Sequence, residues 1–244
     1  MPHHSASQSA ASSSPKQTCL DDLRQRILAM DIAPGADLDE TALSAHYGVS
    51  RTPLREVLQR LGGEGYVTLS ENRGAKVASM DLAQMRSFFQ TAPMVYASTA
   101  RLAAENRSPG QIAILKEVQS SFATAVASTD AAEMALHNHR FHAEIGEMAG
   151  NAYLSPSLRR LLIDHTRLGQ MFYRAEDETD RTAIATASAQ HDQMIDAIEG
   201  QDPARAVTIT LAHWDLSRDR IERFVRPAPL PLDPTEPQEA ANAL

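Results

Sequence analysis

The sequence predicts a mostly α-helical protein with two parts, an N-terminal winged helix-turn-helix domain and a C-terminal all-α bundle of six to seven helices. Hydrophobic residues make up 43% of the chain but aromatic residues only 5%, which favours helices rich in Ala and Leu. Residues 20–79 contain three short helical patterns followed by glycine-rich turns and two strand-like runs. Residues 81–225 show apolar residues at helical spacing in long segments with short breaks, which is typical of a bundle.

Length, charge and cysteine content narrow the class of protein further. The 244 residues suit one large or two small domains, and the net charge of −8 argues against a non-specific nucleic-acid coat while permitting a local basic patch. A single cysteine, Cys19, excludes an intrachain disulfide and suits a reducing cytoplasm. No apolar run approaches the roughly 18 residues that span a bilayer. We therefore expect a cytoplasmic protein without a membrane partner.

Four segments follow from composition. Residues 1–17 are rich in Ser and Ala without periodicity, and residues 226–244 contain five prolines, so we expect both tails to be disordered. Residues 18–80 are assigned to the winged domain and residues 81–225 to the bundle.

The winged domain is expected to begin with a helix at 20–30 and a Pro-Gly turn at 32–36. Asp39 should cap a short second helix at 40–47. A third helix should start after a capping Ser50 or Thr52 and end at Gly62-Gly63. Strands at 66–69 and 75–79 should then form a two-stranded ribbon around a hairpin turn.

The third helix carries two chemically different faces. Its apolar residues recur at i, i+3, i+4 and i+7, and they are Leu54, Val57, Leu58 and Leu61. Arg51, Arg55 and Gln59 fall on another face, which suits a recognition helix in a DNA major groove. An ordinary amphipathic surface helix shows the same periodicity and stays open as an alternative on this pattern alone.

The segment PGADLDETALSAHYGVSRTPLREVLQRLGGEGYVTLSENRGAKV, residues 34–77, resembles the DNA-binding domain of GntR-family bacterial transcription regulators. The resemblance implies that Arg51, Thr52 and Arg55 contact DNA and that Gly74 at the wing tip reaches the minor groove. Thr41 stands where many relatives carry an arginine. The cations on which DNA affinity would depend are Arg51, Arg55, Arg73 and Lys76.

The bundle is expected to contain helices at 82–105, 109–127, 131–149, 152–173, 177–200 and 202–224. Asp81 and the segment Ser128–Asp130 are the expected caps of the first and third of these helices. Pro93 lies inside the first helix and is expected to kink or interrupt it.

Polar side chains interrupt three of the apolar stripes in the bundle. Asn138 and His142 lie four residues apart on the third bundle helix, His191 lies within the stripe of the fifth, and His213 within that of the sixth. A lone histidine of this kind is usually a hydrogen-bonded core residue, but three of them favour a shared metal site. Imidazole ligands suit zinc, nickel, iron or copper.

The bundle also resembles the FCD domain, the ligand-sensing domain of the FadR subgroup of GntR regulators. The resemblance lies in Asn138–His142, in the segment HDQMIDAIEG at 191–200, in His213 and in Gly150-Asn151. It implies a divalent metal ion, zinc or nickel, and an effector bound by Asn138, His142, His191 and His213. Arg167 is a further effector candidate. Asn138 replaces the usual Asp, and its neutral oxygen predicts weaker metal retention. Direct effector binding without a metal is the alternative.

These observations predict a sequence-specific DNA-binding transcriptional regulator, a repressor, that acts as a homodimer on a two-fold operator. A small-molecule effector, an organic acid, would modulate operator affinity. Two alternatives are a metal-dependent enzyme and a constitutive DNA-binding protein whose bundle only dimerises. No carboxylate lies at a clear general-base spacing and nothing resembles a nucleophile triad, so we expect no enzymatic activity.

Overall fold

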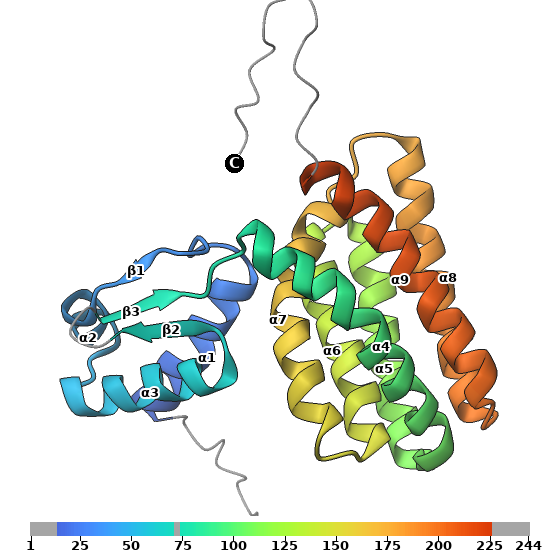
Figure 1. Ribbon diagram of the computed structural model, residues 1–244, viewed down its shortest axis with the longest axis horizontal. Helices are drawn as coiled ribbons and strands as arrows, with labels where there is room; N and C mark the ends of the chain where they lie inside the picture. Colours follow the sequence, from blue (N-terminus) through green and yellow to red (C-terminus); the bar gives the residue numbers. More distant parts are fainter. Residues whose placement is uncertain (1–13, 71–73, 226–244) are drawn as a thin grey trace, which may run out of the picture.

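The computed structural model describes residues 14–70 and 74–225, with side chains up to Arg218. A small winged domain lies beside a taller helical bundle, and α4 begins at the junction between them (Figure 1). The winged domain consists of α1 (Pro15–Leu28), β1 (Asp37–Leu38), α2 (Glu40–Tyr47), α3 (Arg51–Glu64), β2 (Val67–Ser70) and β3 (Gly74–Val77). The bundle consists of α4 (Leu82–Asn106), α5 (Pro109–Ser128), α6 (Ala131–Ala149), α7 (Leu154–Phe172), α8 (Glu178–Glu199) and α9 (Pro203–Val225).

The first helix begins earlier than the sequence pattern predicts. It starts at Pro15, so residues 15–17 are helical, and their assignment to a disordered tail is wrong. The Ser14 hydroxyl accepts a hydrogen bond from the amide of Gln17, and proline at the first helical position lacks only an N–H that would be unpaired anyway. The expectations for residues 1–13 and 226–244 lie outside the described residues.

The sheet has one more strand than expected. β1 pairs antiparallel with β3, which pairs antiparallel with β2, and the order is β1-β3-β2. β1 has only two residues, too few to show a period of two, and its buried Leu38 joins the domain core. The two longer strands form the predicted hairpin, with Ser70 opposite Gly74.

The helix α3 does not end at the predicted glycine pair. It continues through Gly62 and Gly63 to Glu64, and Gly65 closes it in the left-handed region at φ +93°. A Cβ at Gly62 would lie 3.2 Å from the Leu69 side chain, so glycine lets β2 approach the helix. Ser50 is the N-cap residue by position, although its side chain makes no capping hydrogen bond.

The long helix α4 continues through Pro93, so the proline does not interrupt it. The proline removes one backbone hydrogen bond, but Ala92, Val95 and Tyr96 around it are buried in the bundle core. Tertiary packing therefore holds the helix together. Asp81 caps α4 and Asp130 caps α6, as predicted.

The six bundle helices bury two hydrophobic clusters. α4 packs against α6, α7 and α9, while α5 packs against α6 and α8. The helix α7 stands on the side of the bundle that faces the winged domain (Figure 1). Among the described residues, no helix is long and apolar enough to cross a membrane.

Candidate nucleic-acid interface and metal centre

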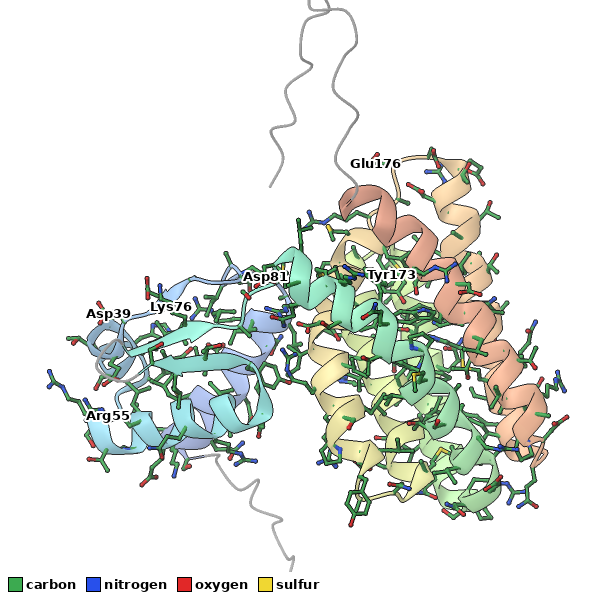
Figure 2. All side chains as sticks on the ribbon, in the orientation of Figure 1. Asp39, Arg55, Lys76, Asp81, Tyr173 and Glu176 are labelled. Carbon is green, nitrogen blue, oxygen red and sulfur yellow. The ribbon has the colours of Figure 1, made fainter. Side chains whose placement is uncertain are left out.

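The predicted two faces of α3 are present. Leu54, Val57, Leu58 and Leu61 are all buried in the winged-domain core. Arg51, Thr52 and Arg55 are exposed, and Arg55 points away from the bundle (Figure 2). The domain thus presents an Arg-bearing helix surface to solvent beside its wing.

Two of the candidate DNA-binding cations are already paired with carboxylates. Nε of Arg55 lies 3.1 Å from a carboxylate oxygen of Glu40, and Nζ of Lys76 lies 3.1 Å from one of Asp37. Arg51 makes no ion pair with the part of the chain that the structure describes. Arg73 lies outside the described residues, and Gly74 begins β3 in the left-handed region at φ +77°.

A groove runs between α3 and the wing. It is lined by Glu40, Arg55, Leu58, Gln59, Leu69, Ser70, Gly74 and Ala75. The Glu40 carboxylate therefore lies where a DNA phosphate or base edge would approach Arg55. The exposed face of α3 and the wing form one continuous surface around this groove. Its positive charge is partly compensated by the carboxylates of Glu40 and Asp37.

The three predicted histidines come together inside the bundle. His142 on α6, His191 on α8 and His213 on α9 are all buried, and their ring nitrogens can be chosen so that all lie within 4.8 Å of one another. The ring centroids are 4.7 Å apart for His191 and His213 and 5.5 Å apart for His142 and His213. Three separate helices thus point imidazoles at one common point.

Hydrogen bonds fix which nitrogen of His191 carries its proton. The side-chain N–H of Gln119 donates to the backbone carbonyl of Ser188 at 3.1 Å, so the Gln119 oxygen must face His191. That oxygen lies 2.9 Å from Nδ1 of His191, which therefore donates. Nε2 then carries a lone pair. Gln190 accepts from Nδ1 of His213 at 3.1 Å in the same way.

Buried polar atoms of the predicted ligand residues have no partner among the described residues. They are Nε2 of His142, Nε2 of His191 and Oδ1 of Asn138, which lies one turn before His142 on α6. Burial lowers the pKa of His142 and of His191 well below the usual range, so both imidazoles are neutral with a free lone pair. Unpaired acceptors in a core are costly, and a shared cation would satisfy them. This donor set fits a divalent transition metal.

A fourth histidine, His165 on α7, lies beside the cluster and was not predicted. Its Nδ1 is 2.7 Å from the Tyr96 hydroxyl, and its ring centroid is 5.7 Å from that of His142. The pattern that revealed the other three histidines also holds for His165, because it follows Leu158 and Leu162 at helical spacing on a buried face. His165 and His213 line a small cavity with Gly169, Phe172, Tyr173, Ala187 and Ser217.

Arg167, the remaining effector candidate, does not line that cavity. Its side chain is completely buried and donates to the carbonyl of Ala78 at 2.8 Å and to the Asp164 carboxylate. Its contacts lie with the connection between the two domains.

A winged helix-turn-helix joined to a helical bundle with a buried polar centre defines the class of two-domain DNA-binding regulators. The model of the FCD domain matches residues 94–216, and that of bacterial regulatory proteins of the gntR family matches residues 15–77. The chain belongs to the GntR family of transcriptional regulators and carries an FCD domain. Because this family consists of regulators, the prediction of a non-enzymatic DNA-binding regulator is confirmed.

Similar proteins agree with this assignment. The Nta operon transcriptional regulator of Aminobacter aminovorans is 28% identical over 192 residues, which cover 68% of this chain and 88% of the relative. The gluconate operon transcriptional repressor of Bacillus subtilis is 22% identical over 204 residues, 82% of each chain. The structure of Escherichia coli McbR/YncC covers 88% of this chain and 100% of its own with a TM-score of 0.73 at 19% identity, which shows a common fold.

Proposed function

We propose that the protein is a homodimeric transcriptional repressor whose operator affinity is set by a small anionic effector bound at a metal centre. Asn138, His142, His191 and His213 would hold the metal. The observation that carries the proposal is the convergence of three buried imidazoles, each of which offers one ring nitrogen within 4.8 Å of the nitrogens of the other two. The protein would act in the cytoplasm, on operator DNA.

The chemistry of the donor set favours an anionic effector. Three neutral imidazoles and one neutral amide oxygen leave the full charge of a divalent ion uncompensated. A carboxylate in the adjoining cavity would compensate that charge, and the His165 imidazole and the Ser217 hydroxyl line the same cavity. The cavity, at about 10 Å³, has room for no more than one water molecule, so a compact organic acid would enter only if the cavity widened. Zinc and nickel suit these ligands.

The winged domain would read DNA through α3 and the wing. Arg51, Thr52 and Arg55 would contact base edges or phosphates, and Arg73, Gly74 and Lys76 would reach the backbone or minor groove. Two such domains in a homodimer match a two-fold operator. Two of the relatives are named repressors, which supports repression as the sign of control.

Operator selection with purified protein tests the DNA-binding part. Random-sequence or genome-wide selection should return a two-fold site, and Arg51→Ala should weaken binding to it by about 10- to 100-fold, the value of one good base contact. Arg101→Ala is the matched control, because it removes the same charge from an exposed position on α4. Equal affinity of the Arg51 variant and the control would contradict this docking.

Metal analysis tests the second part. Protein purified without chelators or a nickel column should contain, or take up on titration, about one zinc per chain. His142→Ala and His191→Ala should abolish uptake, and His46→Ala, an exposed histidine on α2, should not. If no variant differs because the wild-type protein binds no metal, the cluster binds its effector directly, and screening organic acids by thermal shift becomes the decisive experiment.

A further inference from the structure

The helix α7 is buried on all sides over much of its length. Residues 162–170 are all buried, which is unusual for a helix with several polar residues. A helix of this kind lies between two packed bodies, and α7 lies between the winged domain and the rest of the bundle (Figure 1).

One face of α7 belongs to the winged domain. Ile163 packs in the core of that domain, and the side chain of Gln170 donates to the carbonyl of Leu28, the last residue of α1, at 3.3 Å. Arg160 lies so close to Gly65 that a Cβ there would collide with its side chain. These contacts join α7 to the core of the winged domain and to the C-terminal ends of α1 and α3.

The segment that joins the domains is held from the same face. Arg167, completely buried, donates to the carbonyl of Ala78 in the connection between β3 and α4 at 2.8 Å. Its partner Asp164 also accepts from Gln84 of α4 at 3.1 Å and from Arg160 at 3.0 Å. A buried charge that loses its partner is strongly destabilising, so this network favours one placement of the connection.

The opposite face of α7 belongs to the histidine centre. His165 lines the small cavity with His213 and bonds to Tyr96 of α4. Arg167 is two positions after His165, which places the side chains about 200° apart around a helix with 3.6 residues per turn. The same rigid element therefore contacts the cavity on one side and the interdomain connection on the other.

We propose that α7 couples the histidine centre to the DNA-binding domain and that Arg167 is the positioning residue of this coupling. Movement of His165 when the cavity is occupied displaces α7, and Arg167 with Asp164 carries the displacement to Ala78 and the winged domain. The part that concerns cavity occupancy rests on the proposed function. The hydrogen bonds of Arg167 with Ala78 and Asp164, which we call the latch, do not depend on the proposed function.

Hydrogen exchange of the full-length protein without metal tests the latch. Arg167→Met keeps a similar volume and removes the bond to Ala78. Exchange in peptides covering residues 78–81 should rise by about tenfold or more, while peptides from α5 keep the wild-type rate. Arg101→Met is the matched control, and Gln84→Ala, at a half-buried position, is a milder second variant if Arg167→Met does not fold. Wild-type exchange at 78–81 in both Arg167→Met and Gln84→Ala overturns the proposal.

Zinc alone serves as the probe of coupling. In the wild type, zinc should slow exchange in α6, α8 and α9 and also change it at 78–81. In Arg167→Met, zinc should still slow exchange in α6, α8 and α9 but should no longer change exchange at 78–81. Protection of the three helices with no change at 78–81 in the wild type overturns the coupling and leaves the metal centre intact. If zinc protects nothing, the metal part of the proposed function fails, and the comparison without zinc still decides the latch.

Discussion

The side chain of Gln119 on α5 accepts a hydrogen bond from Nδ1 of His191 at 2.9 Å, and its own N–H donates to the carbonyl of Ser188. The backbone of α8 thereby orients the glutamine, and the glutamine orients the imidazole. His191 is held in one tautomer, with a lone pair on Nε2, which is buried and has no partner among the described residues. An outer partner of this kind is characteristic of histidines that serve as metal ligands.

Gln119→Leu should weaken zinc binding by about 10- to 100-fold, because leucine fills similar space but cannot orient the ring. The measurement is a competition titration with a zinc-sensitive dye. Gln193→Leu, on the exposed side of α8, is the control and should bind like the wild type. An unchanged zinc affinity in the Gln119 variant would show that the hydrogen bond has no part in ligand orientation.

The metal-free protein should lose stability as the pH falls below neutral. Burial lowers the pKa of His213 to about 4 and that of His165 to about 3, whereas an unfolded histidine titrates near 6.5. Between about pH 6.5 and 4 these two imidazoles bind protons in the unfolded chain but not in the folded chain. The stability that they contribute is therefore fully present above pH 6.5 and is lost as the pH falls through this window. Each imidazole contributes at most about 1.4 kcal/mol per pH unit.

Urea unfolding at pH 7.5, 6 and 5 with a chelator present checks this slope. His165→Phe should reduce it, and His46→Ala, at an exposed position, should leave it unchanged. A free energy of unfolding that stays constant from pH 7.5 to 5 would mean that the folded protein binds as many protons as the unfolded chain over this range, which contradicts the lowered pKa values.

Glu40→Gln should raise operator affinity by about two- to fivefold, because it releases Arg55 from an exposed ion pair of the kind that contributes about 0.2–1 kcal/mol. The salt dependence of binding should steepen as well, because Arg55 becomes free to neutralise a phosphate. Glu117→Gln on the exposed face of α5 makes the same charge change far along the chain. Fluorescence anisotropy at several salt concentrations compares the two, and equal gains would assign the effect to net charge alone.

Gly146→Ala should destabilise the bundle by about 1–3 kcal/mol. A Cβ at this position would lie 2.5 Å from Cδ2 of Leu158, a buried residue of α7, so the packed Leu158 side chain would have to move or α6 and α7 would have to separate. Gly110→Ala in the first turn of α5 has open space around the new methyl group and should be neutral or stabilise by up to about 1 kcal/mol. Thermal unfolding of both variants measures the difference, and similar melting temperatures would refute the close packing.

Apolar repeats along single helices predict part of the histidine centre but not its hydrogen-bond partners. His142, His191 and His213 were identified because each interrupts an apolar repeat, and the structure brings them together. His165 interrupts an apolar repeat on α7 in the same way, after Leu158 and Leu162. No pattern in the sequence could connect Gln119 with His191, because that bond joins helices 72 residues apart and depends on how α5 and α8 pack.

Local signals decided most of the fold. Caps such as Asp39, Asp81 and Asp130 and the periodicity of Leu54 to Leu61 fixed helix positions, because a helix end needs a partner for its amides and a helix face needs burial. Predictions failed where packing overrode propensity. α4 passes through Pro93, and α3 passes through Gly62, whose missing side chain admits Leu69.

The sequence by itself determined the family, the two domains, the two faces of α3 and three of the four histidines of the buried cluster, because each depends on residue type and spacing along one element. Tertiary structure alone decided that Arg55 and Lys76 are paired with acids and that Arg167 holds the connection at Ala78 rather than lining the cavity. Charge pairing and burial depend on which surfaces meet in space, and the helix α7 acquires its two roles only when both domains pack against it.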